Sequence, residues 1–500
     1  MTRRASLVAA WAWLVTAHVA AQANSAAQDA VGFGDPAPQP PAASDALGFG
    51  DAPRPAAARV AEPAPFQLGL SLAWQSALRV TSDRPRRIAK LRQVLAAYAQ
   101  YSQDSGALRF TARIAGRSEV DFEYLMHAAD YDPASYQQYA WQLHWGESYL
   151  ALDLSGLELR VGQQVVSFGQ GEMLSVLDVV NPRDLREPLL TDPSELRLPL
   201  LMTQLGFTQG SLRTQLLVVH EPYFGLSAPP LGEWSPLRKL LLENRALGPA
   251  LGDRALRNRH EPAQWPLDPA ATQLHGRLTW SGPGVDLTLS AGSMLDALGV
   301  PSLPPPSAFN GALIDMPIHH PRYASFGHSG AWTLGAFVVR WEAAFDHQHP
   351  LTARRTDSAL PSWFALRRHQ LQGMLGVLYA PGVSTSAALE VAQTYVLDNP
   401  GRSRELRVAP LFPVESTRLA LRFNHSFWSD RCNVSFLLLR IGGQALNAWA
   451  ARAELGVKLL DAVEVSLGFI TYQPTSRFGF FYGFERHERA YLNVRWDVSR

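Results

Sequence analysis

The residues from Leu108 to Met126, LRFTARIAGRSEVDFEYLM, alternate between apolar and polar side chains. The apolar residues on even positions are Leu108, Phe110, Ala112, Ile114, Val120, Phe122, Tyr124 and Met126. A period of two predicts a β-strand with one apolar face and one polar face. One unbroken strand over this stretch would reach roughly 65 Å, which soluble β-sandwiches rarely use.

The same alternation recurs from residue 66 to the C-terminus, and it assigns a face to each residue. The apolar positions, expected to face lipid, include Leu68, Leu70, Leu72, Trp74, Leu78, Val80, Leu274, Leu278, Trp280, Val285, Leu287, Leu289, Leu371, Leu375, Val377, Tyr379, Leu419, Leu421, Phe423, Leu455, Val457, Leu459, Val465, Leu467 and Phe469. The positions between them, expected to face a lumen, include His275, Arg277, Gln370, Gln372, Glu390, Arg418, Arg422, Glu454, Glu464 and Ser466. Hydrocarbon enforces this separation, because an Arg or Lys at mid-depth costs about 2–4 kcal/mol.

Short and long connections also alternate along the chain. Tight turns are expected at 155–156, 209–210, 281–284, 380–382, 429–430 and 460–462, and longer connections at 169–199, 221–272, 296–321, 347–365, 398–414 and 474–487. Transmembrane barrels have short periplasmic turns and long outer loops. We therefore predict an all-β fold, a single antiparallel transmembrane barrel of about 18 strands (about 16 to 20). Both ends would be periplasmic, and the long outer loops could plug the lumen.

Closure into a barrel also follows from the backbone. No run of 18 apolar residues follows the N-terminal segment, so a closed sheet is the remaining way to satisfy backbone polar groups in lipid. The last segment, 489–500, alternates as a terminal strand and resembles the strand by which outer-membrane barrels are recognised for assembly, although it ends in Ser499-Arg500 instead of an aromatic residue. The alternative is a soluble double-sheet or solenoid protein.

The N-terminus predicts export. Two arginines, a short apolar core and Ala21-Gln22-Ala23 form a signal peptide over residues 1–23. Residues 24–65 are rich in Ala and Pro, which predicts a disordered periplasmic arm, and residues 66–500 form the barrel. The arm repeats a GFGD unit, and its repeated residues, candidates for docking a partner, are Phe33, Asp35, Phe49 and Asp51. Duplication within a low-complexity linker is the alternative.

Composition and motifs exclude several function classes. A formal net charge of +1 argues against a nucleic-acid binder, and the single Cys432 cannot close an intrachain disulfide. His319-His320 and His347-Gln348-His349 lack nearby cysteines or clustered carboxylates, so no metal site is expected. No Gly-x-Ser-x-Gly elbow or phosphate loop is present. We therefore expect no enzyme activity, no catalytic residues and no cofactor.

Two motifs carry a family resemblance. Residues 159–169, LRVGQQVVSFG, are followed by Asp178-Val179-Val180-Asn181-Pro182-Arg183-Asp184. This arrangement resembles the Arg-x-Gly-x-Gln strand and Asn-Pro loop of an uncharacterised proteobacterial outer-membrane family, domain of unknown function 1302. The resemblance extends over about residues 67–500. It implies a porin or transporter similar to alginate-export proteins, handling a hydrophobic or amphiphilic molecule beside an inner-membrane exporter.

The connection at 169–199 mixes acids and arginines, and its Asn-Pro, Glu-Pro and Asp-Pro pairs break any long helix. Folded into the lumen, it would form a constriction in which opposite charges set a field across the pore. The candidate residues are Arg160, Glu172, Asp178, Arg183, Asp184 and Arg186. Ordinary salt bridges on an exposed loop are the alternative. A helix with Ser235 as its cap and Pro236 in its first turn is expected within 235–243, either as a lid across the pore or on the barrel rim.

These observations predict a channel or transporter of the Gram-negative outer membrane, with its N-terminal arm in the periplasm. The expected partners are outer-membrane lipid, the barrel-assembly machinery and a periplasmic or inner-membrane exporter component. The alternative is a barrel that transports nothing and presents its surface loops for adhesion or binding.

Overall fold

The computed structural model describes residues 65–81, 87–190, 195–261, 268–355, 363–397, 408–410, 416–442, 448–474, 481–484 and 486–499. The expected signal peptide lies outside these residues. The arm up to residue 64, with Phe33, Asp35, Phe49 and Asp51, lies outside them too.

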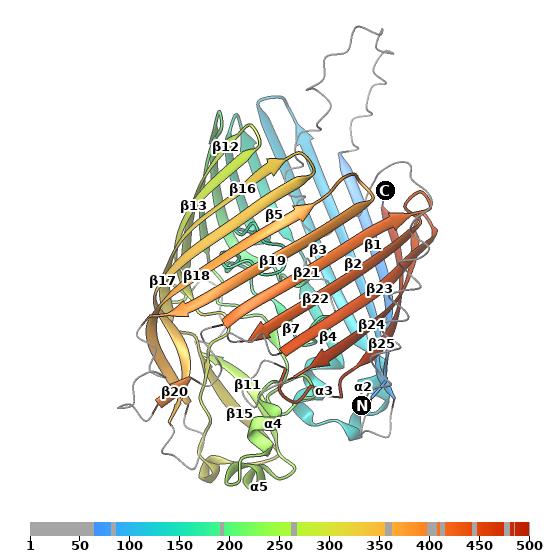
Figure 1. The fold of residues 1–500 in the computed structure, drawn as a ribbon, viewed down its shortest axis with the longest axis vertical. Coiled ribbons are helices and arrows are strands. Elements are labelled where there is room, and N and C mark those ends of the chain that lie inside the picture. The colour runs from blue at the N-terminus through green and yellow to red at the C-terminus, as the bar shows by residue number, and fades with distance from the viewer. Residues whose placement is uncertain are drawn as a thin grey trace.

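Eighteen strands of the described chain form one antiparallel barrel, as the alternation predicts (Figure 1). Its first half comprises β1 (Phe66–Arg79), β2 (Ile88–Asp104), β3 (Leu108–Asp121), β4 (Trp141–Trp145) with β5 (Ser148–Leu154), β6 (Leu157–Gln164), β8 (Leu200–Gln209), β9 (Leu212–Val219), β12 (Gln273–Gly282) and β13 (Val285–Leu295). Its second half comprises β16 (Arg322–Leu334), β17 (Phe337–Arg355), β18 (Trp363–Tyr379), β19 (Thr385–Val396), β21 (Ser416–Phe427), β22 (Cys432–Gly442), β23 (Ala448–Leu460), β24 (Val463–Gln473) and β25 (Arg489–Ser499). The β4 and β5 segments both pair with β3 and count as one wall strand. Because β25 pairs with both β24 and β1, the sheet is closed and no edge remains.

The faces follow the predicted parity. Leu289 and Leu375 are 56% and 57% exposed on the outer surface, whereas the inward-facing His275 and Glu390 are 2% and 3% exposed. The outer surface is therefore apolar and the inner surface polar, as a barrel in lipid requires.

Aromatic side chains gather at the end of the barrel that carries the short hairpins. They are Tyr101, Phe110, Phe207, Trp280, Trp332, Phe337, Tyr379, Phe427, Trp428 and Trp496. Such a ring marks a membrane–water interface. The first residues of β1 and the last of β25 lie at this end too, since Gly69 pairs with Ser499. Both termini of the barrel are thus on the short-turn side, the expected periplasmic side.

The prediction of one strand from Leu108 to Met126 is wrong beyond Asp121. The Asp121 Oδ1 atom accepts hydrogen bonds from Glu123 N (3.1 Å) and Leu91 N (3.2 Å), and the chain turns into helix α2 (Phe122–Met126). Tyr124 stacks on Tyr139 at 5.1 Å and is 4% exposed, so it does not face lipid. An aspartate cap stops the strand although the apolar alternation continues.

The expected long connection at 347–365 is also wrong in part. Strand β17 continues to Arg355 and β18 begins at Trp363, so the hairpin extends beyond the neighbouring strands. A bulge between Asp346 and His349, with Gln348 at φ 57°, marks the point where the hairpin leaves the regular wall. Strand β20 (Val408–Pro410) pairs with the outer end of β17.

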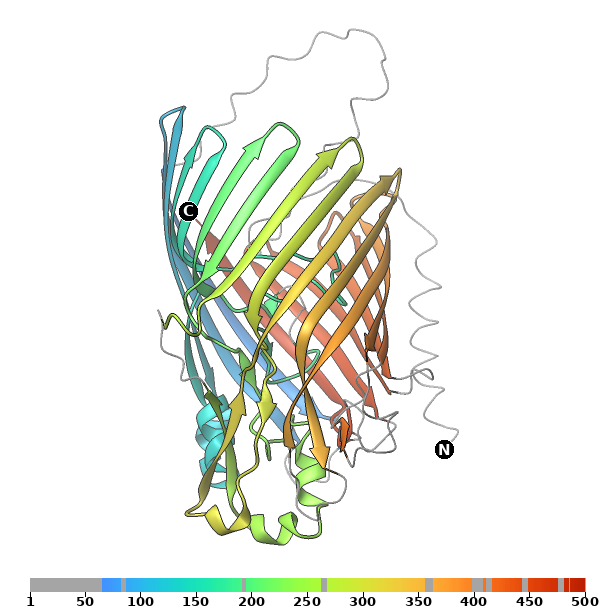
Figure 2. The ribbon, with the colours of Figure 1, turned by 90° about the vertical axis from the view of Figure 1, so that its left-hand side faces the viewer.

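The long loops form a folded layer at the opposite end of the barrel from the short hairpins (Figure 2). We call this layer, residues 122–139, 220–261, 268–271 and 296–320, the outer-loop domain. Its elements besides α2 are η1 (Ala128–Asp130), α3 (Pro133–Tyr139), β10 (Leu226–Ser227), α4 (Arg238–Leu242), α5 (Leu247–Leu251), β11 (Ala255–Glu261), β14 (Val300–Pro301), η3 (Pro306–Ala308) and β15 (Leu313–His319). Strand β10 pairs with β7 (Asp184–Leu185), and β15 lies between β11 and β14.

The helix expected within 235–243 is shorter than predicted. Helix α4 begins at Arg238, after a turn in which the Ser235 hydroxyl accepts a hydrogen bond from Leu237 N (3.2 Å). Its Leu240 and Leu241 are buried with Leu256 and Met316 in a core of the outer-loop domain. No helix among the described residues is long and apolar enough to cross a membrane.

Candidate functional site: a loop folded against the inner wall

The connection between β6 and β8 enters the barrel. We call its described residues, 165–190 and 195–199, the lumen loop and residues 170–177 its tip. Three residues of this loop, Leu174, Val176 and Leu177, pack with Ala344, Met374, Ala392 and Ala420, which belong to β17, β18, β19 and β21. These strands are not neighbours of β6 or β8 in the sheet, and the four wall residues face inward. The loop therefore crosses the interior to reach the opposite wall.

Two carboxylates of that wall, Glu342 of β17 and Glu390 of β19, hold the tip. Glu342 accepts hydrogen bonds from the backbone N–H groups of Gln170 (2.6 Å), Gly171 (2.7 Å), Val176 (2.7 Å) and Leu177 (2.9 Å) and from the Ser175 hydroxyl (2.9 Å). Glu390 accepts from the N–H groups of Glu172 (2.6 Å), Met173 (3.0 Å) and Leu174 (2.7 Å). Converging backbone N–H groups form an anion-binding concavity, and charged acceptors make the stronger hydrogen bonds. Each glutamate thus fills a concavity that the loop backbone makes.

The base of the loop is closed by the two motifs of the family resemblance. Asn181 accepts a hydrogen bond from Val166 N (2.8 Å) and donates to the carbonyls of Gln164 (2.9 Å) and Leu198 (2.8 Å). Gln164, fully buried, donates to Met202 O (2.9 Å). One asparagine therefore ties the entry of the loop to its exit, and we call this arrangement the clasp.

Gly162, inside the Arg-x-Gly-x-Gln motif, is required for a close approach. Its φ is 137°, and a Cβ at this position would lie 2.3 Å from the Ser148 carbonyl oxygen and 2.7 Å from the Cα atom of Tyr149. Only glycine adopts this conformation without strain. The motif thus lets β5 and β6 pair closely just before the clasp.

Two of the six predicted candidates line the interior in partly exposed ion pairs. Glu172 pairs with Arg340 of β17 at 2.7 Å, and the two side chains are 31% and 21% exposed. Arg160 of β6 pairs with Glu158 at 3.2 Å and lies over the Tyr149 ring at 4.6 Å. These two pairs keep water contact inside the barrel.

Asp178 and Arg183 belong to a network within the loop. The Asp178 carboxylate, 1% exposed, binds Arg183 (2.8 Å) and Arg197 (2.8 Å). The Arg183 side chain is 33% exposed, and the backbone of Arg183 forms an isolated antiparallel β-bridge with that of Arg197. This network joins the two sides of the lumen loop above the clasp.

Asp184 and Arg186 lie where the lumen loop meets the outer-loop domain. The Arg186 guanidinium, 3% exposed, binds Asp184 (2.6 Å) and Glu119 of β3 (3.0 Å), and it donates to Gln138 O (3.2 Å). Burial opposes ionisation of Asp184, but hydrogen bonds and charge from Arg186 outweigh it and lower the Asp184 pKa. Arg186 is thus enclosed by protein, unlike Arg160 and Glu172.

The sequence did not single out Glu342 or Glu187 as residues that hold the lumen loop. Glu187 contacts Lys90 of β2 and lies 3.6 Å from Arg489 of β25, whose guanidinium is stacked 3.6 Å over the Trp234 ring. Lys90 and Arg489 occupy inward positions of their strands, so a charge at a polar-face position was the available signal. The alternation of residues along a strand shows which side chains face inward. It does not show which residue on the other side of the lumen each of them contacts.

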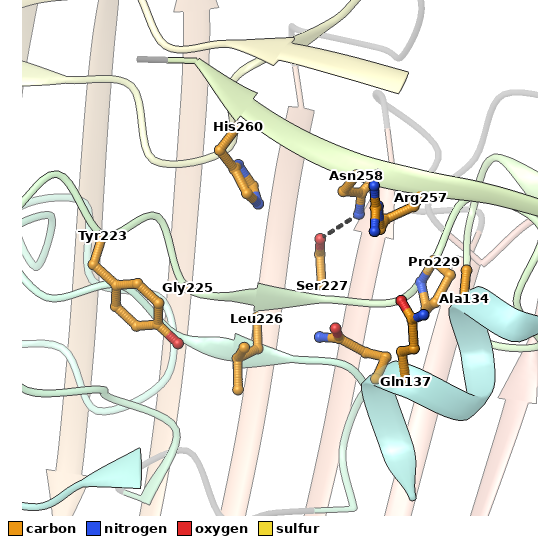
Figure 3. Close-up of a pocket in the computed structure, with 11 residues that line it drawn as sticks. Ala134, Gln137, Tyr223, Gly225, Leu226, Ser227, Pro229, Arg257, Asn258 and His260 are labelled. Atoms are coloured by element: carbon orange, nitrogen blue, oxygen red, sulfur yellow. Dashed lines mark hydrogen bonds between the residues drawn. The ribbon is translucent and has the colours of Figure 1, made fainter. Parts of the chain in front are cut away.

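A separate cavity of about 210 Å³ opens in the outer-loop domain between α3, β10 and β11 (Figure 3). Most of its polar lining is neutral, with Gln137, Tyr223 and Asn258 beside the cationic Arg257. Asn258 donates to the Ser227 hydroxyl at 2.9 Å. Burial, together with the charges of Asp184 and Glu221, raises the pKa of Tyr223 despite the opposing charge of Arg186, so its hydroxyl is a neutral hydrogen-bonding group.

The closed wall, the apolar exterior and the loop held inside define a membrane-type β-barrel with an internal loop. No family model and no curated protein matches this chain. Among solved structures it is similar to Pseudomonas aeruginosa OccK1 (OpdK), at 11% identity and a TM-score of 0.46, covering 87% of this chain and 99% of that one. It is also similar to Acinetobacter baumannii OccAB4, at 10% identity and a TM-score of 0.48, covering 87% of this chain and 98% of that one. Pseudomonas aeruginosa OccK11 (OpdR) matches at 12% identity and a TM-score of 0.45, covering 87% of this chain and 96% of that one. Because the similarity is this low, the function of the chain has to be inferred from its own residues.

Proposed function

We propose that this chain is an outer-membrane channel whose passage is restricted by the lumen loop. The observation that carries the proposal is the attachment of the loop tip to Glu342 and Glu390 on the opposite wall. A loop fixed across a closed barrel narrows the interior while the wall stays intact. The partly exposed pairs of Glu172 and Arg160 supply opposite charges beside that passage.

We further propose an amphiphilic cargo. On β21 the inward positions carry Arg418 and Arg422, which pair in register with Ile441 and Leu437 of β22. A cationic strip therefore runs beside an apolar strip on the inner wall, and this combination suits a molecule with an acidic head and an apolar body. Cooperation with an inner-membrane exporter, through Phe33 and Phe49 of the arm, belongs to the same proposal, as does membership of the family of unknown function 1302.

The channel is tested by conductance in planar bilayers with an ion gradient. Glu172→Gln removes a negative charge from the passage and is expected to shift the reversal potential towards anion selectivity. Arg160→Gln is expected to shift it the other way, because among the described residues Glu158 then keeps one cationic partner, Arg213 (2.8 Å), in place of two. Asp104→Asn, at the exposed tip of the β2–β3 hairpin, is the control and should leave the potential unchanged.

A folded barrel that carries no steady current would contradict the channel and favour the alternative, a barrel that presents its loops for binding. That alternative rests on the outer-loop domain, which has its own sheet and apolar core. Deleting residues 24–60 tests the arm separately. Unchanged capture of periplasmic partners and unchanged transport would contradict docking through the repeats without affecting the conductance result.

A further inference from the structure

The lipid-facing surface changes character abruptly at the outer ends of β16, β17 and β18. From Tyr379 to Leu371 the outward residues of β18 are apolar, a rise of roughly 27 Å along the strand at about 3.4 Å per residue. A strand tilt of about 40° reduces this to about 20 Å, close to the height of the apolar band in barrels of this kind. The next outward residue is His369, so it lies at the level of the outer headgroups.

Four basic residues meet at this level on the outside of the wall. We call Arg322, His347, Arg367 and His369 the outer-rim basic cluster. The His347 and His369 rings are 4.7 Å apart, and His369 also stacks on Phe345, a residue of the apolar band, at 5.8 Å. The cluster therefore begins where the band ends.

The two arginines are held in place by backbone carbonyls. Arg367 donates to Arg322 O (3.0 Å), reaching over Pro350 of β17, the residue opposite it in the register. Arg322 in turn donates to Ser293 O (3.3 Å), Ala270 O (2.9 Å) and Thr272 O (2.8 Å). Carbonyl acceptors fix the position of a guanidinium without cancelling its charge.

Ion pairs among the described residues leave the charge of the cluster unneutralised. Within the described part of the chain no carboxylate pairs with any of the four residues, whereas Arg340 and Arg452 inside the barrel pair with Glu172 and Glu454. Arg367 and His347 are exposed. An uncompensated cationic patch at headgroup depth is complementary to a phosphorylated headgroup, and guanidinium groups bind phosphate by paired hydrogen bonds.

We propose that the outer-rim basic cluster binds the phosphorylated headgroup of an outer-leaflet lipid. The lipid would seat its acyl chains on the apolar band below Phe345, and its phosphate would accept hydrogen bonds from Arg367, His347 and His369. This inference rests on the membrane location that the proposed function assigns, and it does not require the barrel to conduct.

The probe is lipid A, added to the full-length chain in detergent and followed by native mass spectrometry. Wild type should retain lipid A and bind it at least about tenfold more tightly than lipid A lacking its phosphates. The double variant Arg367→Ala/His369→Ala should lose this tenfold preference, and Arg367→Lys should keep part of it. Inorganic phosphate at millimolar concentration should not compete, since the acyl chains contribute to binding.

Arg109→Ala, which removes the same charge at the opposite end of the barrel, is the matched control and should bind as wild type does. Gel mobility with and without heating verifies that each variant is a folded barrel. Equal affinity of wild type and double variant, no discrimination against dephosphorylated lipid A, or full competition by inorganic phosphate would each overturn the proposal. A barrel that binds lipid A but carries no current would contradict the channel and leave the lipid site standing.

Discussion

At the residue scale, Glu342 is the side chain on which the interior most depends. It is 2% exposed, and its two oxygens accept four backbone N–H groups and one hydroxyl of the lumen loop. Within the described residues no arginine or lysine forms an ion pair with it, although the charge of Arg418 on β21 interacts with it. Its two oxygens are held by backbone N–H groups and by the Ser175 hydroxyl of the loop. The tip therefore needs the Glu342 carboxylate as its hydrogen-bond acceptor, and the buried carboxylate needs the donors of the tip. Each buried donor left without an acceptor costs about 1–3 kcal/mol.

Glu342→Gln is therefore expected to release part of the tip. The amide keeps one acceptor oxygen and replaces the other by donors that face N–H groups, so two or more loop hydrogen bonds are lost. We expect faster amide exchange at residues 170–177 and larger current fluctuations, with the barrel wall unchanged. Glu464→Gln, an inward glutamate of β24, is the control. Exchange at the tip as slow as in wild type would show that Glu342 does not hold the loop.

At the element scale, a histidine pair joins two strands of the outer-loop domain. His320, the residue after β15, uses Nδ1 to donate to Asp296 O (2.6 Å), and its Nε2 lies 2.9 Å from Nδ1 of His260 on β11. A carbonyl can only accept, so neutral His320 must accept from His260 through Nε2. Phe224 stacks on His320 at 3.4 Å and lies 5.7 Å from His260.

Acidification is expected to loosen this pair. Burial lowers the pKa of His320 to about 3 and also lowers that of His260, while the Asp296 carbonyl opposes the change at His320 and the charges of His260 and His319 add to it. Because folding lowers these pKa values, the neutral histidine pair contributes fully to stability at a pH above the ordinary histidine pKa of about 6.5. This contribution is lost as the pH falls from there towards 3. Asp296, whose pKa burial raises, acts in the opposite direction. His319 faces Glu261 at 3.0 Å.

The measurement is amide exchange of residues 255–261 and 313–320 between pH 7 and pH 4, corrected for the intrinsic rate. His260→Gln keeps a side-chain donor, and because only His320 of the pair then titrates, the pH dependence should become weaker. Protection of these residues that is independent of pH in wild type would contradict a role for the pair.

At the scale of the whole molecule, the barrel depends on an apolar exterior and on the pairing of β1 with β25. Leu289, near the middle of β13, is 56% exposed on the outer face. In lipid, Leu289→Arg should lower the free energy of unfolding by about 2–4 kcal/mol. Leu289→Met, which keeps the site apolar, should change it by less than about 1.5 kcal/mol. Unfolding in urea from lipid vesicles measures both, and equal stability of the two variants would place this surface in water.

The predicted residue parities were reliable for most of the wall, because lipid outside and polar groups inside impose one rule on every strand. The rule failed where a local signal competed with it. Asp121 caps α2 while the apolar alternation continues to Met126, and the β17–β18 hairpin continues beyond the bulge at Gln348. At these points the chain leaves the membrane, so alternation no longer reports which side faces lipid.

The sequence by itself determined the strand periodicity, the faces and the alternation of short and long connections, since each depends on residues close together in the chain. Only the tertiary structure decided that the lumen loop reaches Glu342 and Glu390, and that Arg186 is enclosed while Glu172 is partly exposed. The physical reason is that the lumen loop follows β6, which is far from β17 and β19 in sequence and does not pair with them in the sheet. The loop meets Glu342 and Glu390 only across the interior of a closed barrel.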